Sequence, residues 1–545
     1  MINSVNSSLF CQMVVSGGNN LENNKQLVNA LNVFPVPDGD TGTNMSLTFF
    51  SAAAEVSKKE FEKISDAADL IASTTLRSAR GNSGVILSQI FRGFAKGLSG
   101  KEAATIKDFA AALKSASDTA YRAVMKPTEG TILTIIRTMA AAANEYNKDE
   151  DFTAFFEHII NAGNDALNKT PDLLPLLKQA GVVDAGGKGL LIIFEGMLHL
   201  LKYGEIIELS DKTVLDVFIP SQAEVPAEDI KYGYCTEFII NKKNYGVSTE
   251  KFKAAISEKG DSMLVIDELD IIKVHIHTNN PGFVIEKALE IGELVNIKID
   301  NMRMQHRNII GQEAHKEEVS AKVSDTQKEY GIISVVAGEG VSNVFSELGT
   351  DIVLSGGQTM NPSTEDILKC ITNLNAKEIF ILPNNKNIVL AANQAKELSE
   401  KSVTVIPSHT IPQGLSALLA FDPTASKEEN EVAMNNAMIK VKSGSITYAV
   451  RDTNVDGFEI KEGDYLGLTD GKITHTSKDK IQLFKDLLSS IYNDGCEVIT
   501  VFYGEDVSEE EAQSIKEYIE ENYPDCDLLF YNGGQPVYSY ILSVE

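Results

Sequence analysis

Apolar side chains recur at helical spacing through the first 205 residues. Alanine- and leucine-rich segments with this period occupy residues 67–76, 85–94, 109–123, 132–143 and 190–201. Short clusters of Gly, Asp, Asn, Ser and Thr separate the segments, and these residue types are typical of helix starts and turns. The pattern predicts an all-helical domain over residues 1–205, with its most polar and glycine-rich clusters just before helices.

The spacing changes near residue 232. Short runs rich in β-branched residues then alternate with helical patterns. The predicted strands are 234–240, 263–266, 271–277 and 295–299, and the predicted helices are 249–258 and 283–291. This strand-helix-strand-strand-helix-strand order is that of a ferredoxin-like domain, which we assign to residues 206–304, with 216–230 as the linker into it.

A polar linker over residues 305–329 precedes a third region. Strands rich in Val and Ile alternate there with helical patterns, at 331–336, 352–354, 378–382 and 403–406. Residues 497–503, 509–521 and 527–531 form a further strand-helix-strand unit. Such alternation predicts a parallel sheet in an α/β domain over residues 330–545.

Charge and cysteine content narrow the class of protein. The 545 residues include 49 basic and 77 acidic side chains, for a net charge of −28. This acidity argues against nucleic acid and anionic lipid as main partners. The first residues do not form a signal peptide, and the apolar stretch at 190–201 is shorter than the roughly 18 residues of a membrane helix. Five scattered cysteines do not suggest a disulfide framework, so we expect a cytoplasmic protein without membrane insertion.

The densest chemical signal is the acidic loop at residues 32–44, NVFPVPDGDTGTN. Asp38 and Asp40 are separated by one glycine, and a carboxylate pair of this kind suits Mg²⁺ in the presence of phosphate oxygens. We expect Thr43 or Asn44 to cap a helix that begins with Met45. An isolated Asp-Gly-Asp sequence is more often a solvated turn, so the loop alone does not predict a metal site.

Three glycine-rich helix starts accompany the acidic loop. They are RGNSG at 80–84, KPTEGT at 126–131 and DAGGKG at 184–189. Free N–H groups at a helix start can bind an anion, although most such sequences only cap a helix. Four clusters in one helical domain predict a nucleotide-phosphate and metal site. The pattern matches neither a Walker A loop nor a protein-kinase loop.

The middle region contains a candidate zinc site. Strand alternation puts His275 and His277 on one face, and Cys235 together with Glu237 on a neighbouring strand. One cysteine and two histidines suit Zn²⁺, with Glu237, water or a partner-chain group as the fourth ligand. An exposed polar face, or a dimer interface without metal, is the alternative.

Several of these segments resemble the ATP-binding helical domain of dihydroxyacetone kinases, namely 31–47, 79–94, 125–134 and 182–194. The variants NVFPVPDGDTGTNM, ARGNSGVILSQIFRG and MKPTEGTILT are more similar to the bacterial fatty acid kinase (FakA) family, and the resemblance covers essentially the whole chain. It implies a multidomain protein with an all-α helical barrel kinase domain, an α+β ferredoxin-like middle domain and an α/β DegV-like C-terminal domain.

The resemblance also implies roles for individual residues. Asp38 and Asp40 match magnesium ligands, whereas Val33 occupies the position of a third aspartate in dihydroxyacetone kinases. Either Asn32 supplies an oxygen instead or the number of metal ions differs. The implied ATP-binding residues are Thr41, Thr43, Asn44, Ser83, Gly84, Lys126, Thr131, Gly186 and Gly187. The family's middle domain is linked to dimerisation and zinc, which favours structural Zn²⁺ at Cys235, His275 and His277.

The C-terminal domain resembles DegV-like fatty acid-binding proteins but lacks their Thr/Ser-rich headgroup motif in recognisable form. Its loops at 355–363, 382–387 and 533–538 follow strands, so they are either binding loops or ordinary turns. His409 is a further candidate for a binding residue, but it could equally be an ordinary surface residue.

These features predict a kinase that uses ATP and Mg²⁺ to phosphorylate a fatty acid carboxylate. A separate FakB-like fatty acid-binding protein, docked on the C-terminal domain, would present the acid, and the acyl phosphate would feed phospholipid synthesis. We also expect a homodimer. The alternatives are a dihydroxyacetone-type kinase, although the covalent substrate-holding domain is absent, and a non-catalytic nucleotide-binding adaptor.

Overall fold

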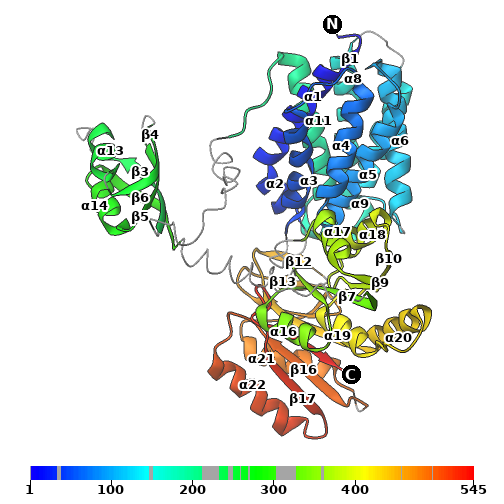
Figure 1. Ribbon diagram of the computed structural model, residues 1–545, viewed down its shortest axis with the longest axis vertical. Helices are drawn as coiled ribbons and strands as arrows, with labels where there is room; N and C mark the ends of the chain where they lie inside the picture. Colours follow the sequence, from blue (N-terminus) through cyan, green and yellow to red (C-terminus); the bar gives the residue numbers. More distant parts are fainter. Residues whose placement is uncertain are drawn as a thin grey trace. The chain divides into compact units, whose positions relative to one another are not determined.

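A computed structural model of the chain forms two compact units, and each is described by itself. Unit 1 combines residues 1–214 with 326–545, and unit 2 comprises 215–325. The structure describes residues 2–32, 39–124, 126–146, 151–210, 232, 234–243, 249–257, 259–267, 271–301, 327–357, 361–455, 457–493 and 495–545. Unit 1 is therefore built from the two ends of the chain, with unit 2 inserted between them in the sequence (Figure 1).

The N-terminal part of unit 1 is a bundle of helices. They are α1 (Ser7–Asn23), α2 (Lys25–Ala30), α3 (Thr41–Val56), α4 (Ile64–Ser78), α5 (Gly81–Gly97), α6 (Ile106–Ala123), α7 (Ile132–Glu145), α8 (Phe152–Asn168), α9 (Thr170–Leu173), α10 (Pro175–Ala180) and α11 (Ala185–Tyr203). The short strands β1 (Val5–Asn6) and β2 (Ala103–Ala104) pair antiparallel. Helix α11 packs against α1, α3, α7 and α8, so it occupies the middle of the bundle.

Aromatic side chains fill the bundle core. Phe109 of α6 is 1 % exposed and contacts the rings of Phe94, Phe152 and Phe156 at centroid distances of 4.9–5.5 Å. The helix ends follow ordinary capping chemistry. Helix α6 begins with a capping box between Thr105 and Asp108, and α11 ends at a left-handed glycine. No helix among the described residues combines the length and apolar character needed to cross a membrane.

The C-terminal part of unit 1 contains a four-stranded parallel sheet. Its strands are β7 (Lys328–Val336), β8 (Ile352–Ser355), β9 (Ala376–Leu382) and β10 (Ser402–Val405), in the order β10-β9-β7-β8. Helices α16 (Glu339–Glu347), α17 (Thr364–Asn373), α18 (Val389–Leu398), α19 (Ile411–Leu419) and α20 (Lys427–Lys440) belong to the same part. The sequence prediction of a parallel sheet is confirmed for these four strands.

A second, six-stranded sheet follows, and it is mixed rather than parallel. Its order is β15-β14-β11-β18-β16-β17. The strands are β11 (Lys442–Tyr448), β14 (Tyr465–Thr469), β15 (Lys472–Ser477), β16 (Val498–Tyr503), β17 (Asp527–Asn532) and β18 (Tyr540–Val544), with helices α21 (Lys480–Ile491) and α22 (Glu509–Asn522). Among the described strands of this sheet, β16 and β17 alone pair parallel, and β18 lies antiparallel between β11 and β16. A small hairpin, β12 (Thr453–Val455) with β13 (Phe458–Ile460), stands apart from both sheets.

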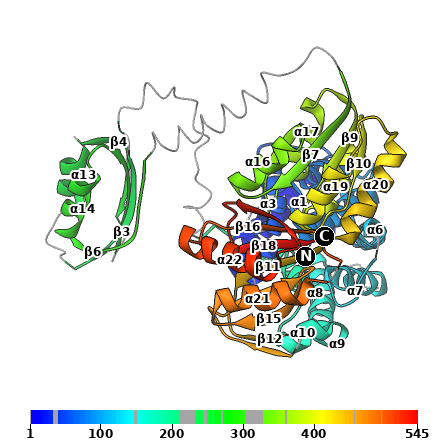
Figure 2. The same cartoon turned by 90° about the horizontal axis from the view of Figure 1, so that it is seen from below.

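The two parts of unit 1 share an apolar core. Ala79 and Val85, at the junction of α4 and α5, belong to one buried cluster with Ile367 of α17 and Ala391 of α18. Helices α17 and α18 lie between the bundle and the parallel sheet (Figure 1), and Figure 2 shows the same unit from below. Helix α17 packs on α4, and α18 packs on α5. The glycine-rich start of α5 therefore lies at the boundary between the two parts.

Unit 2 is a four-stranded antiparallel sheet with two helices. Its elements are β3 (Tyr234–Lys242), α13 (Thr249–Ser257), β4 (Gly260–Asp267), β5 (Ile271–Thr278), α14 (Pro281–Leu289) and β6 (Gly292–Asn301). The strand order is β4-β5-β3-β6, so the first and third strands are central neighbours. Alternate positions such as Phe238, Ile240, Val274 and Ile276 form its core together with residues of the two helices. The two linker segments predicted at 216–230 and 305–329 lie almost entirely outside the described residues.

Candidate functional site

Four helix starts meet at one end of the bundle. The backbone of Gly81, at the start of α5, is so close to α3 that a Cβ there would lie 2.6 Å from Nδ2 of Asn44. A Cβ on Gly189 of α11 would lie 2.7 Å from the sulfur of Met45, also on α3. A Cβ on Gly187 of α11 would lie 2.6 Å from Cγ1 of Ile135 on α7. The N-terminal turns of α5, α3, α11 and α7 are thus neighbours in that order, and their N–H groups are suited to anion binding.

Asp40 occupies the N-cap position of α3 without capping the helix through its side chain. Its Oδ2 instead accepts a hydrogen bond of 2.5 Å from Nδ2 of Asn361, a residue of the C-terminal part. The helix begins at Thr41, four residues before the expected start at Met45, and the N–H of Asn44 already bonds the carbonyl of Asp40. The expectation that Thr43 or Asn44 caps this helix is therefore wrong. Asp38 lies outside the described residues.

The side chains of Thr41 and Thr43 bond two asparagines, one before the acidic loop and one at its first position. Asn29 donates to Oγ1 of Thr43 at 3.0 Å, and Asn32 donates weakly to Oγ1 of Thr41 at 3.4 Å. The N–H of Thr43 returns a bond to Oδ1 of Asn29. These bonds join the first turn of α3 to Asn29 of α2 and to Asn32.

Glycine residues allow a tight start to α5. Gly81 has φ = +57°, a backbone conformation that favours glycine, and the N–H of Gly84 bonds the carbonyl of Arg80. Gly84 faces Thr48 of α3 with no room for a Cβ. Ser83 is half-buried in the same turn. Glycine at these positions lets α3 and α5 approach closely enough for their first turns to form one surface.

Asp184 caps α11 by accepting a bond of 2.6 Å from the N–H of Gly187. Burial raises the pKa of this carboxyl to about 6, although bonds from the backbone of Gly187 and Ile132 oppose the shift. Gly186 and Gly187 are buried where α11 meets α7. A Cβ on Gly186 would lie 3.4 Å from Cβ of Ile132, so the starts of α11 and α7 are in contact.

The turn before α7 is held by a network around Glu129 that sequence reasoning missed. Glu129 accepts bonds from Tyr121, Thr134 and Arg137 at 2.6–2.9 Å. Burial acts to raise the pKa of Glu129, but the bonds from Thr134 and Tyr121 and the charge of Arg137 outweigh it, and the pKa is lowered. Thr131 caps α7 by accepting from the N–H of Leu133, and Lys126 is exposed in the turn.

The largest omission of the sequence analysis is the contribution of the C-terminal part. Asn361 contacts Asp40, and Nδ2 of Asn82 at the start of α5 donates to Oδ1 of Asn387 at 3.3 Å. Arg451 donates to the carbonyl of Ala30, just before the acidic loop, at 2.6 Å. Asn361 and Asn387 lie in two of the loops singled out from the sequence, but nothing in the local pattern indicated that these loops reach the helical part.

Some polar atoms at this boundary are buried and unpaired. Oδ1 of Asn82, Oδ1 of Asn361 and Nη2 of Arg451 have no hydrogen-bond partner within the described parts of the chain. Unpaired buried polar atoms are uncommon and often face a ligand or water. No three His, Cys, Asp or Glu side chains gather as a metal site in the part of the chain that the structure describes. A donor set of one described carboxylate with amide oxygens still fits Mg²⁺, which commonly takes one or two carboxylates plus phosphate oxygens and water.

The candidate zinc residues lie on paired strands of unit 2. Cys235 pairs with His277, and Glu237 pairs with His275, in the register of β3 and β5. Directly opposed positions in an antiparallel pair share a face of the sheet. The side chains of Cys235, Glu237 and His275 lie outside the described residues, so only the backbone pairing bears on this site.

A cavity of about 140 Å³ lies in the C-terminal part, and its lining includes Lys386, Asn387, His409, Ser443 and Tyr538. Two of the loops noted from the sequence and His409 thus meet there. Burial lowers the pKa of His409, and the charge of Lys386 adds to this effect. The loop with Asn387 borders both this cavity and the start of α5.

Three family models match three successive regions of the chain: the helical part, the region of unit 2 and the C-terminal part. A DAK2 domain model matches residues 35–199, a FakA-like fatty acid kinase middle-domain model matches 231–309, and the corresponding C-terminal model matches 331–545. Protein YloV of Bacillus subtilis is 44 % identical over 556 residues, which cover 100 % of both chains. The chain belongs to the FakA-like fatty acid kinase family. The DAK2 match makes the helical part of this family member kinase-like and implies use of ATP.

Two solved structures resemble parts of this FakA-like chain. Dihydroxyacetone kinase from C. freundii, in complex with AMP-PNP and Mg²⁺, is 18 % identical, covers 36 % of this chain and 35 % of its own, and has a TM-score of 0.29. The Streptococcus pneumoniae fatty acid kinase B3 protein loaded with linoleic acid is 14 % identical, covers 40 % and 99 %, and has a TM-score of 0.28. These scores are too low to support an argument about the chain.

Proposed function

We propose that the chain is an ATP- and Mg²⁺-dependent kinase that phosphorylates the carboxylate of a fatty acid. The observation that supports this most directly is the meeting of four helix starts beside Asp40 in a family member with a DAK2 domain. Such an end can offer backbone N–H donors of the first helix turns to phosphate oxygens, and a carboxylate to a metal ion. Phosphoryl transfer depends mainly on positioning and charge neutralisation, which this arrangement supplies.

Each site residue has a role in this proposal. Asp38 and Asp40 would hold Mg²⁺, which when bound neutralises charge on the phosphates. The first turns of α3, α5 and α11, with the cap of α7 and the exposed Lys126, would surround the nucleotide. The proposed ATP-binding residues are Thr41, Thr43, Asn44, Ser83, Gly84, Lys126, Thr131, Gly186 and Gly187.

The proposed acceptor of the phosphoryl group, a fatty acid carboxylate, rests on the family and on acid–base chemistry. A fatty acid carboxylate is already ionised near pH 7, so its attack on the terminal phosphate needs no general base, and we assign none. A separate fatty acid-binding protein would present the acid while docked on the C-terminal part. The product would be an acyl phosphate that feeds phospholipid synthesis.

The domain division belongs to the same proposal. Residues 1–205 would be the kinase domain with a helical barrel, 206–304 a ferredoxin-like middle domain, 305–329 a linker, and 330–545 a DegV-like domain for partner docking. We further propose that the middle domain binds structural Zn²⁺ through Cys235, His275 and His277 and mediates dimerisation. The backbone pairing of Cys235 with His277 and of Glu237 with His275 supports a shared face for these residues.

One experiment separates the candidate functions. The purified chain is incubated with ATP, Mg²⁺ and fatty acid, with and without a fatty acid-binding partner protein, and products are measured by mass spectrometry. Acyl phosphate that forms only with the partner is the expected result. In a parallel reaction with dihydroxyacetone, formation of its phosphate would instead favour a dihydroxyacetone-type kinase. ATP binding without any turnover would favour a nucleotide-binding adaptor.

A further inference from the structure

Asp40 receives its hydrogen bond from a residue 321 positions away in the sequence. Nδ2 of Asn361 donates to Oδ2 of Asp40 at 2.5 Å, across the boundary between the helical and C-terminal parts. An ionised carboxylate only accepts hydrogen bonds, so the amide nitrogen, and not the amide oxygen, must face Asp40. The orientation of the Asn361 side chain is therefore determined by its chemistry.

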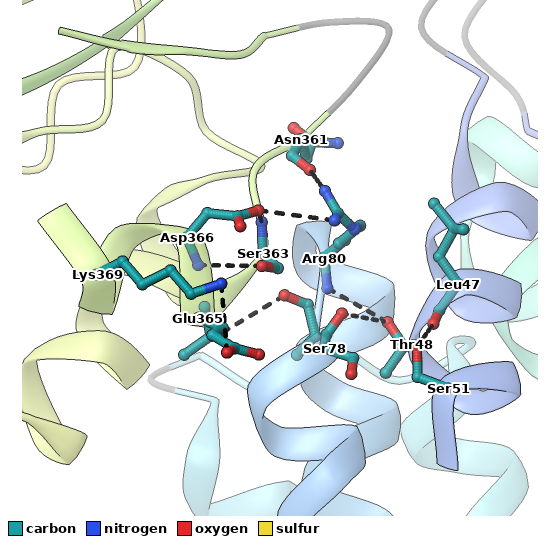
Figure 3. A network of polar contacts seen from close by, with 12 residues as sticks. Leu47, Thr48, Ser51, Ser78, Arg80, Asn361, Ser363, Glu365, Asp366 and Lys369 are labelled. Atoms are coloured by element: carbon teal, nitrogen blue, oxygen red, sulfur yellow. Dashed lines mark hydrogen bonds and ion pairs between the residues drawn. The ribbon is translucent and has the colours of Figure 1, made fainter. Parts of the chain in front are cut away.

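The backbone of Asn361 is held by a second set of contacts (Figure 3). Nη1 of Arg80 donates to the carbonyl of Asn361 at 2.7 Å, and Nη2 lies 3.6 Å from Oδ2 of Asp366. Ser363 pairs with Arg80 in an isolated β-bridge, and Ser363 and Asp366 form the capping box of α17. These contacts attach the segment before α17 to the residue that precedes α5.

The same segment is packed as tightly as a protein core. Asn361 is 1 % exposed, and the N–H of Thr364 donates to the carbonyl of Ala79 at 3.1 Å. A side chain with so little freedom can fix the direction of the carboxylate that it contacts. The guanidinium of Arg80 contacts the carbonyl of Asn361 and the carboxylate of Asp366. Arg80 therefore acts on Asp40 by holding Asn361 in place and not through its own charge.

The carboxamide oxygen of Asn361 could accept a hydrogen bond but is given none by the described residues. This atom, Oδ1, is buried. A buried acceptor without a hydrogen-bond partner is unfavourable, so packing alone does not explain an asparagine at this position. A leucine would fill a similar volume without this cost, but it could not donate to Asp40.

We propose that Asn361 is a positioning residue, which orients Asp40 for Mg²⁺-dependent nucleotide binding and so makes the site complete only when the C-terminal part is docked. This inference rests on the proposed kinase function. Asn361 does not itself react in this scheme. It acts through Asp40 as an outer partner of a metal ligand acts in known metal sites, where loss of such a partner costs about 10- to 100-fold in affinity or activity.

The test measures nucleotide binding rather than turnover. The full-length Asn361→Leu variant is titrated with a non-hydrolysable ATP analogue at a series of Mg²⁺ concentrations by calorimetry. We expect the Mg²⁺ concentration for half-maximal binding to rise about tenfold. Asn361→Ala serves as a second variant if leucine prevents folding, and thermal unfolding reports whether each variant is intact.

Gln394→Leu is the matched control. Gln394 of α18 is 5 % exposed and bonds the carbonyl of Leu76 across the same boundary, but it does not contact Asp40. We expect it to lower stability without changing the Mg²⁺ requirement. Equal shifts in both variants would mean that docking in general, and not Asn361, governs the site, and an unchanged or lower requirement in the Asn361 variants would also overturn the inference.

A double variant checks that the effect passes through Asp40. In the Asp40→Asn background, Asn361→Leu should cause no further change in the Mg²⁺ requirement, because the two residues act as one unit. Independent, additive effects would contradict the proposal. If the wild-type chain shows no Mg²⁺-dependent nucleotide binding, the kinase function itself fails. Normal wild-type binding with unaffected Asn361 variants overturns the positioning role alone.

Discussion

The guanidinium of Arg80 donates a hydrogen bond of 2.7 Å to the carbonyl oxygen of Asn361, although 281 positions separate the two residues. This bond joins the residue before α5 to the segment before α17. The candidate site therefore does not belong to the helical part alone, and changes in either part should affect it.

Replacement of Asp40 by asparagine tests the proposed metal ligand. The change keeps the side-chain volume but removes the negative charge that would neutralise Mg²⁺. We expect turnover to fall about 100-fold or more, which corresponds to about 3 kcal/mol of lost transition-state stabilisation. The measurement is the rate of ATP-dependent acyl phosphate formation with a fatty acid-binding partner present.

Asp118→Asn provides the control for this variant, because Asp118 is exposed on α6 and its carboxylate pairs with the exposed Lys114, far in sequence from the acidic loop. It should retain wild-type turnover. An Asp40→Asn enzyme with normal turnover would remove Asp40 from the proposed machinery.

Gly84→Ala tests the close approach of α3 and α5. The added methyl group would meet Oγ1 of Thr48, which is itself buried and bonded to the carbonyl of Asn44. Overpacking of this kind costs about 1–3 kcal/mol, so the free energy of unfolding in urea should fall by that amount. Combination with Thr48→Ala removes the clashing oxygen. The double variant should therefore be less destabilised than the sum of the two single variants, and simple additivity would argue against the clash.

The helices of the bundle were predictable because their apolar spacing is regular. Predicted segments at 67–76, 85–94 and 109–123 fall within α4, α5 and α6. Helix α8 lies within the region predicted to be all-helical but was not assigned a segment of its own, although its apolar residues Phe152, Phe155, Phe156, Ile159 and Ile160 follow the same period. The apolar spacing of α8 was therefore sufficient to assign this helix from the sequence.

The pH dependence of stability tests the environment of Asp184. Its pKa is raised from 3.8 to about 6 in the folded chain, so between these values the native state binds more protons than the unfolded state. Stability contributed by this group is thus fully present below pH 3.8 and is lost as the pH rises through about 6. Relative to Asp184→Asn, the free energy of unfolding of the wild type should decrease over this window without nucleotide. A constant or rising difference would contradict the raised pKa.

Metal analysis tests the middle region. If Cys235 is a zinc ligand, elemental analysis of the purified full-length chain should give zinc in the wild type and markedly less in Cys235→Ser, because thiolate is a strong zinc ligand. Cys526→Ser is a suitable control, since Cys526 lies in the C-terminal part and should leave the zinc content unchanged. Wild-type protein purified without zinc would refute the site.

The remaining features could not be read from local patterns. Asp40 and Asn361 meet through the packing of α17 and α18 on the bundle, and periodicity contains no information about such docking. The mixed sheet was likewise missed because β11, KSGSITY, is rich in Ser and Gly, and because pairing direction depends on where β18 returns. The acidic loop was recognised, but the start of α3 was misjudged because Asp40 itself occupies the cap position.

The apolar cluster around Ala79 and Val85 has a consequence for synthesis of the protein. The ribosome produces these two side chains early, but Ala391 of α18, which belongs to the same cluster, comes roughly 310 residues later. At about 5 to 20 residues per second, translation of that interval lasts about 16 to 62 s. During this time the nascent helices present a bare hydrophobic surface, which makes them a natural client for molecular chaperones until the last third of the polypeptide emerges.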